Sequence, residues 1–216
     1  MKRFSAEERR MRLGRRHHLA AAAASDDEVA ASLVGLHSTD PATVYLGCRA
    51  RLADFTGSEL ERALYEDRTL LRVLGMRRTM FVVPRDLAAV MDAGCARFLA
   101  APERRRLVDY LENQGVAGSG DAWLEDVEHR TVEALERIGP ATARELTAEV
   151  PELATKLTFG EGKKWGGQVG VSTRVLFLLA TGGQIVRGKP RGTWLSSQYE
   201  WATVEGWLPE GLDEIS

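Results

Sequence analysis

Positively charged side chains of this 216-residue chain are concentrated in two segments, and phosphate is the group that such segments could bind. The net charge is only -2, yet residues 1–18 carry seven Lys or Arg against two acids, and residues 163–199 carry six against none. Acidic side chains gather elsewhere, in residues 103–149 and 200–216. Blocks of one sign indicate a nucleic-acid-binding surface that the total charge conceals. For residues 1–18, an exposed and merely solvated helix is the alternative.

Other residues that could support catalysis or metal binding lack partners at the required spacing. Residues 160–164, Gly-Glu-Gly-Lys-Lys, resemble a phosphate-binding loop but lack its earlier glycine and the Ser or Thr after the lysine, so they predict a flexible basic loop. His17 and His18 adjoin an arginine run and His129 stands alone among acids, which does not indicate a metal site. We expect no metal ion and no organic cofactor.

The two cysteines and the hydropathy indicate a cytoplasmic protein. Cys48 and Cys95 each fall within an apolar helical pattern, which predicts buried free thiols rather than a disulfide. No segment approaches the roughly 18 consecutive apolar residues of a membrane span. The arginine-rich N-terminus is not followed by the apolar stretch of a signal peptide.

Helix starts in the first half of the chain are marked by capping residues. A Ser or Thr followed three residues later by Glu can form a capping box, and four such pairs mark predicted helix starts, the last of them in the second half: Ser5/Glu8, Ser25/Glu28, Ser58/Glu61 and Thr142/Glu145. Asp40 before Pro41 marks a fifth start. The predicted helices in this half span residues 6–18, 26–36, 41–52 and 59–66. The second and third are separated by four residues, a spacing typical of a helix-turn-helix.

A β-hairpin follows these helices. Residues 70–75 and 79–83 are rich in β-branched and aromatic side chains, residues 76–78 join them, and Pro84 ends the second run. Three helices and a hairpin tipped by Arg77 and Arg78 match the plan of a winged helix, in which one helix enters a groove of DNA and the wing follows phosphates. The first unit is predicted to span residues 1–95.

The plan recurs in the second half. An apolar stripe predicts a helix over residues 124–138, Thr142 begins a short one, and residues 168–181 form a third. Predicted strands over residues 184–187 and 193–195 flank a basic turn. We therefore expect a mainly α fold with small β-hairpins (α+β), built as tandem winged helix-turn-helix units. The remaining predicted boundaries are a helical connector at 96–121, a second unit at 122–200, and the start of a missing or truncated third unit at 201–216.

The chain resembles the winged-helix DNA glycosylases of bacteria, whose members excise bulky alkylated bases and unhook some interstrand crosslinks. The resemblance lies in residues 35–51, which begin Gly-Leu-His-Ser-Thr-Asp-Pro, in the hairpin from Arg72 to Pro84, and in the Gly-Pro-Ala-Thr run at 139–142. It implies a DNA-repair hydrolase that acts on the N-glycosidic bond in double-stranded, damaged DNA. It also implies a nucleoid-associated location in the cytoplasm.

The resemblance also implies the catalytic residues. In the family, a glutamine, one spacer, and a glutamine or aspartate are thought to position water and stabilise the sugar cation; His37 and Thr39 match these positions, with Ser38 as the spacer. His37 could act as a general base and Thr39 could hold the water. Alternatively, His37 ends a helix near its negative dipole end and Thr39 is a turn residue that bonds locally.

Basic residues of both units are the predicted DNA contacts. In chain order they are Arg49, Arg51, Arg77, Arg78, Lys163, Lys164, Arg174, Arg187, Lys189 and Arg191. Without a third unit, Trp201 and Trp207 should lie exposed, and such apolar surface could bring about dimerisation. Two rival functions remain: a non-catalytic winged-helix DNA-binding protein such as a transcription regulator, and a protein-interaction module.

Overall fold

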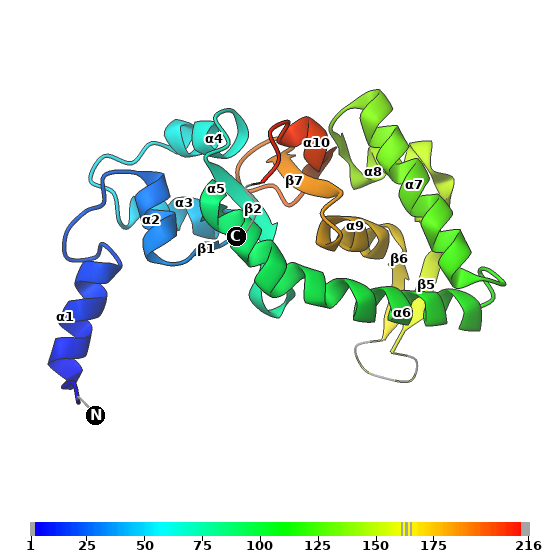
Figure 1. Cartoon of the computed structure of the whole chain (residues 1–216), viewed down its shortest axis with the longest axis horizontal. Coiled ribbons are helices and arrows are strands. Elements are labelled where there is room, and N and C mark those ends of the chain that lie inside the picture. The colour runs from blue at the N-terminus through cyan, green and yellow to red at the C-terminus, as the bar shows by residue number, and fades with distance from the viewer. Residues whose placement is uncertain (1–2, 161, 163, 165, 213–216) are drawn as a thin grey trace. The chain divides into compact units, whose positions relative to one another are not determined.

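The computed structural model describes residues 3–160, 162, 164 and 166–212, and these form two compact units (Figure 1). The first comprises the residues up to Met91 together with Thr193–Ser197, and the second comprises Asp92–Gly192 and Gln198–Gly211. None of the helices in the described part of the chain is long and apolar enough to cross a membrane.

The first unit is a set of helices on a three-stranded antiparallel sheet. Its elements are α1 (Ala6–Arg16), α2 (Asp26–Ser32), β1 (Leu36–His37), α3 (Pro41–Arg49), α4 (Gly57–Tyr65), β2 (Leu70–Leu74), the 3-10 turn η1 (Met76–Arg78), β3 (Met80–Pro84) and α5 (Arg85–Met91). Strand β3 lies in the middle, between β1 and β2. The core is formed by apolar side chains of α2, α3, α4 and the sheet, among them Val29, Val44, Leu60, Leu70 and Val82.

The second unit repeats part of this order, with two further elements in front and a two-stranded ribbon between its last two long helices. It consists of the π-helical turn η2 (Asp92–Ala96), α6 (Arg97–Asn113), α7 (Gly120–Ile138), β4 (Ala141–Thr142), α8 (Ala143–Glu149), η3 (Pro151–Ala154), β5 (Lys156–Phe159), β6 (Gly167–Gly170), α9 (Ser172–Thr181), β7 (Ile185–Pro190), β8 (Tyr199–Thr203) and α10 (Val204–Trp207). Its main sheet has the order β4-β8-β7, and β5 pairs with β6 in a separate ribbon.

In each unit a helix, a very short strand and two helices precede an antiparallel hairpin that completes a three-stranded sheet, and in the second unit η3 and the β5–β6 ribbon separate those two helices. This mixture of helices and small antiparallel sheets confirms the predicted fold class. The finer assignment, tandem winged helices, stays a prediction.

All four helices predicted in the first unit differ from their predicted bounds; those predicted at 6–18 and 41–52 end early, at Arg16 and Arg49. The helix predicted to reach residue 36 ends at Ser32, because Val34 and Gly35 have φ angles of 62° and 136° that a right-handed helix does not allow. The helix predicted from residue 59 begins at Gly57, and the Thr56 hydroxyl accepts the Glu59 N–H. The predicted capping pair of Ser58 and Glu61 is therefore wrong.

Two predictions in the second unit are also wrong. The predicted helix at 168–181 begins only at Ser172, because Gly167–Gly170 pairs with β5 and glycine is a poor helix former. Residues 193–195 are not a strand; the partner of β7 is Tyr199–Thr203. In that strand the buried Tyr199 and Trp201 alternate with the less buried Glu200, a period of two that indicates a strand.

The C-terminal tryptophans are buried, against expectation. Trp201 and Trp207 are only 9% and 8% exposed, because β8 is an internal strand and the Trp207 ring lies against Gly188. Residues 201–207 thus belong to the second unit rather than to the start of a third. Both cysteines are free as predicted, but only Cys48 is buried; Cys95 is half-buried.

Helices α6 and α7 of the second unit meet at Gly120. A Cβ atom at this position would lie 2.8 Å from the Val108 carbonyl oxygen, and the Gly120 N–H donates to Glu112 Oε1 at 2.8 Å. By contrast, a Cβ atom at Gly118 would meet no atom within 4 Å.

We expect Gly120→Ala to destabilise the protein by about 1–3 kcal/mol, because backbone rather than a movable side chain occupies the space. Thermal unfolding should show a Tm lower by roughly 2–10 °C. Gly118→Ala is the matched control and should leave Tm nearly unchanged. Equal Tm values for the two variants would contradict the close approach of α6 and α7.

The turn of the first unit's hairpin holds two arginines in left-handed conformations. Arg77 has φ 58° and ψ 26°, Arg78 has φ 61°, and the Thr79 N–H donates to the Met76 carbonyl at 3.2 Å. This is the geometry of a type I′ turn, which favours Asn-Gly. A side chain with a Cβ costs roughly 1–2 kcal/mol in this conformation. The chain therefore presents two exposed arginines at an energetic cost.

Replacement of both arginines by the favoured turn residues, Arg77→Asn with Arg78→Gly, should stabilise the protein by about 1–2 kcal/mol. Urea unfolding should show a higher midpoint with an unchanged m value. Arg77→Lys with Arg78→Lys keeps both charge and strain, so its midpoint should equal that of the parent. An Asn-Gly variant no more stable than the parent would show that the turn is not strained.

Candidate functional site

The turn that follows β1 is held in place by the sheet and by α3. His37 pairs with Phe81 of β3, and the next backbone N–H, that of Ser38, donates to the Met80 carbonyl at 2.8 Å. The Thr43 hydroxyl lies 2.6 Å from the His37 carbonyl oxygen and 2.7 Å from the Asp40 carbonyl oxygen. The backbone from residue 37 to 40 is thereby fixed on both sides.

Gly35 allows β1 to approach β3 closely. Its φ of +136° lies in a region that side chains with a Cβ rarely adopt, and a Cβ there would lie 2.9 Å from a Val83 methyl group. Leu36 is then buried beneath the sheet, and His37, on the alternate face, is exposed.

The side chains of His37 and Thr39 lie together at the surface. Thr39 Oγ1 is 3.4 Å from His37 Nε2, and both residues are exposed. The imidazole meets the Phe81 ring edge-on, with 5.6 Å between centroids. The alternative prediction that His37 ends a helix is wrong, because His37 is a strand residue. The sequence analysis missed Phe81 and Thr43 as supports, although the alternation of residues 80–84 places Phe81 on one face of a strand.

An imidazole beside a hydroxyl can accept a proton from water and orient that water. A carboxylate that could place a fixed negative charge beside this pair is less available. Asp40 is the nearest carboxylate in the sequence, but its Oδ1 accepts the Ala42 N–H at 2.9 Å and caps α3. Among the described residues, no group of three or more His, Cys, Asp or Glu could hold a metal ion.

The predicted DNA-binding arginines of the first unit fall into two groups. Arg49, Arg77 and Arg78 are exposed, the first near the end of α3 and the others in the hairpin turn. Arg51 is half-buried, and its Nη1 donates to the Gly47 carbonyl at 2.8 Å.

In the second unit, two predicted arginines are engaged with neighbours. The Arg174 guanidinium lies 4.9 Å from the centre of the Phe159 ring and 3.7 Å from buried Glu103. Arg187 is half-buried and lies over the Trp201 ring at 4.9 Å. Lys164 and Lys189 are exposed, and Lys163 lies outside the described residues.

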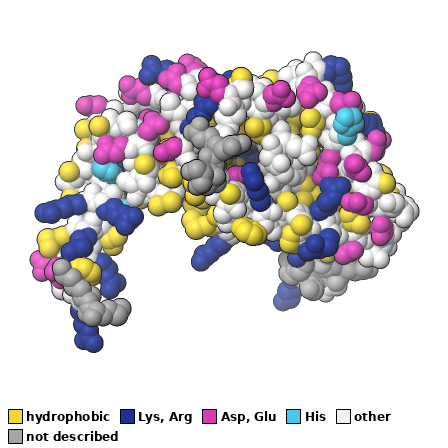
Figure 2. Space-filling model, in the orientation of Figure 1, with side chains coloured by type: hydrophobic (Ala, Val, Ile, Leu, Met, Phe, Trp, Pro, Cys, Tyr) yellow, Lys and Arg dark blue, Asp and Glu magenta, His cyan; other side chains and the backbone are white. Residues whose placement is uncertain are grey.

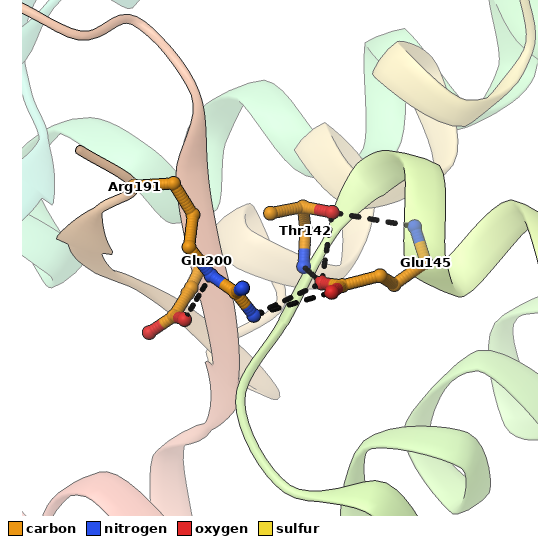
Figure 3. A network of polar contacts seen from close by, with 4 residues as sticks. All are labelled: Thr142, Glu145, Arg191 and Glu200. Atoms are coloured by element: carbon orange, nitrogen blue, oxygen red, sulfur yellow. Dashed lines mark hydrogen bonds and ion pairs between the residues drawn. The ribbon is translucent and has the colours of Figure 1, made fainter.

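Arg191 lies between two carboxylates (Figure 3). Its guanidinium pairs with Glu200 of β8 and, at 3.2 Å, with Glu145 of α8. Glu145 also accepts the Thr142 N–H at 2.8 Å, which completes the predicted capping box of α8. Hydrogen bonds from Thr142, followed by the nearby Arg191, lower the pKa of Glu145. Arg191 therefore joins the hairpin of the second unit to the start of α8.

Comparison with known proteins identifies a family. The model of the family described as "DNA glycosylase AlkZ-like" matches residues 30–215. The chain is also similar to the solved structure of Streptomyces sahachiroi DNA glycosylase AlkZ, with a TM-score of 0.59 and 15% identity. That match covers 94% of this chain and 50% of the other, so the chain spans half the length of this relative. No curated protein matches the chain.

The structural likeness, at this level of identity, shows a shared fold, and the family assignment rests on the match to the family model. Because that match extends over most of the chain, the protein belongs to the AlkZ-like DNA glycosylase family.

Proposed function

We propose that this protein is a DNA glycosylase that hydrolyses the N-glycosidic bond of alkylated bases, bulky or cross-linked, in duplex DNA. The observation that carries the proposal is the exposed pair of His37 and Thr39, fixed on the sheet that also carries the Arg77–Arg78 turn. Membership of the family supports the same reaction class. Such an enzyme would work at the nucleoid in the cytoplasm.

In the proposed reaction, alkylation has already placed a positive charge on the purine, which makes it a good leaving group. His37 Nε2 accepts a proton from a water molecule that Thr39 helps to hold, and the water oxygen bonds to the sugar carbon C1′. The bond from C1′ to the base nitrogen breaks, and its electron pair neutralises the base. The products are a free base and an abasic site, and the reaction needs no acid to protonate the leaving group. A bulky or cross-linked adduct could be held without full base flipping.

The exposed cations are the leading candidates for phosphate contacts. These are Arg49, Arg77, Arg78, Lys164 and Lys189. Arg51, Arg174 and Arg187 are half-buried, and Arg191 pairs with two carboxylates, so these four are weaker candidates. Lys163 completes the proposed set. The proposed division into winged-helix units at 1–95 and 122–200, with a connector at 96–121, would place phosphate contacts in both.

A second candidate function is non-catalytic duplex binding, as in a transcription regulator. It is favoured by the loss of the family's glutamine or aspartate at Thr39 and by the use of Asp40 as a helix cap. A regulator would prefer one duplex sequence and ignore lesions, whereas a glycosylase would release a base with little sequence preference.

Base release from a duplex that carries an alkylated guanine tests the catalytic proposal. We expect His37→Ala to slow single-turnover release by about 100-fold or more, because it removes the general base. Thr39→Ala should slow release by a smaller factor, and Thr39→Ser should retain most of the rate. Both His37 and Thr39 are exposed, so Tm should not change.

His129→Ala is the matched control, since this exposed histidine lies on α7 of the second unit. It should release base at the parent's rate. Parent-like release by His37→Ala would remove His37 from the mechanism. A parent that binds the duplex with sequence preference and releases no base from any alkylated substrate would favour the regulator.

Salt dependence of duplex binding tests the arginine turn. Arg77→Ala with Arg78→Ala should reduce the slope of log K against log salt by about 1.8, as expected for two lost phosphate contacts. Arg191→Ala should leave the slope unchanged and lower Tm, because that guanidinium is paired with two carboxylates. A smaller slope for Arg191→Ala, with an unchanged slope for the double variant, would assign phosphate binding to Arg191 instead of the turn.

A further inference from the structure

Helix α1 lies outside the region that matches the family. The family match begins at residue 30, whereas α1 spans Ala6–Arg16. None of its residues is buried, so packing does not explain why the sequence forms a helix there. In Figure 2, dark blue Lys and Arg side chains gather over this helix.

Three of the five arginines of α1 form a stripe. Arg9, Arg12 and Arg16 are spaced three and four residues apart, which places them on one face of the helix. Like charges at this spacing repel one another and destabilise an isolated helix. An anion that lies along this face would remove the repulsion.

The two acids of α1 do not neutralise this stripe. Glu7 and Glu8 are both in the first turn, where the helix dipole favours anions. Glu8 also completes a capping box with Ser5, since its Oε2 accepts the Ser5 N–H at 2.8 Å. The acids therefore stabilise the start of the helix, and the positive charge lies beyond it.

The segment after α1 is fixed to the body of the first unit. His18 Nε2 lies 3.7 Å from Glu28 Oε1, and the buried Ala23 donates its N–H to the Arg51 carbonyl at 2.9 Å. The chain thus joins the first unit beside the end of α3, where Arg49 is exposed.

We infer that α1 is a second duplex-binding element, which lies along the sugar–phosphate backbone and adds about three phosphate contacts without reading bases. The choice of duplex DNA as the partner of α1 rests on the proposed function. Arginine suits this partner because its planar guanidinium binds phosphate oxygens through two N–H groups at once. The Phe4 ring lies 4.1 Å from the Arg12 guanidinium carbon and covers one side of its plane, which leaves the N–H edge for phosphate.

The side chains of α1 fit DNA better than a membrane surface. A helix that lies on a membrane has a continuous apolar face rich in Trp, Phe and Leu. The large apolar side chains of α1 are Met11 and Leu13, which are two residues apart and therefore point to different sides of the helix.

The test is the full-length triple variant Arg9→Ala, Arg12→Ala and Arg16→Ala, titrated with an undamaged duplex at several salt concentrations. The slope of log K against log salt should fall by about 2.7, and the affinity near 0.1 M salt should fall on the order of 10- to 100-fold. Tm should stay that of the parent, because no residue of α1 is buried.

Two controls isolate the stripe. The triple Lys variant at positions 9, 12 and 16 keeps the charge and should keep most of the slope. Arg62→Ala, Arg97→Ala and Arg137→Ala together remove three exposed arginines that pair with Asp67, Asp92 and Glu149, and should leave the slope unchanged. If the slope fell equally in both triple Ala variants, the effect would come from net charge alone, and the inference would be overturned.

Further outcomes separate this inference from the proposed function. If the triple α1 variant binds the duplex like the parent but loses binding to phosphatidylglycerol vesicles, the helix serves a membrane and the inference is wrong. The parent could release no alkylated base while the triple α1 variant still shows a smaller slope of log K against log salt on undamaged duplex. In that case the inference stands and the proposed function fails. A parent that binds no duplex at all would overturn both.

Discussion

The pairing of β1 with β3 is the interaction on which the first unit's candidate site depends. Only two residues take part, with Leu36 opposite Val82 and His37 opposite Phe81. Burial of Leu36 stabilises the pair, and the φ of Gly35 lets the chain turn from α2 into it. Without this pairing, His37 would not be held beside Thr39 by the sheet. The candidate chemistry thus depends on Leu36 and Gly35, although neither residue has a side chain that could take part in it.

The corresponding strand of the second unit produces a different surface. Thr142 of β4 lies opposite Glu200 of β8, and Arg191 connects Glu200 to Glu145. Exposed ion pairs of this kind contribute little to stability, about 0–1 kcal/mol each, so the effect of Arg191 is to fix the hairpin relative to α8. The first unit leaves an exposed imidazole and hydroxyl at the equivalent point. The two units share much of their order of elements, and this difference in side chains is why the proposed catalytic pair lies in the first.

The sequence predicts those helices and strands that depend on residues close together in the chain. The capping boxes at Ser5 and Thr142 mark helix starts correctly, and the runs before and after residues 76–78 form the predicted hairpin. Strands β1 and β4 could not be predicted, because two residues have no periodicity and pair only with distant ones. The burial of Trp201 depends likewise on its neighbours β4 and β7. The proximity of His37 and Thr39 followed from their spacing, but the contact with Phe81 required the register of the sheet.

The distribution of ion pairs explains how a chain of net charge -2 can offer phosphate-binding surfaces. In the second unit, arginines and acids of nearby helices pair with one another: Arg104 with Asp121 and Glu128, Arg130 with Asp126 and Glu152, and Arg137 with Glu149. Each of these three arginines lies within 3.3 Å of a carboxylate, which largely cancels the electrostatic field of its guanidinium at a distance. In α1 the two acids lie only in the first turn, and the hairpin turn presents Arg77 and Arg78 despite the cost of their backbone conformation. Because screening in salt limits attraction to about 10 Å, a phosphate responds to these local groups rather than to the net charge. The position of the acids therefore determines where the proposed phosphate contacts can form as much as the position of the arginines does.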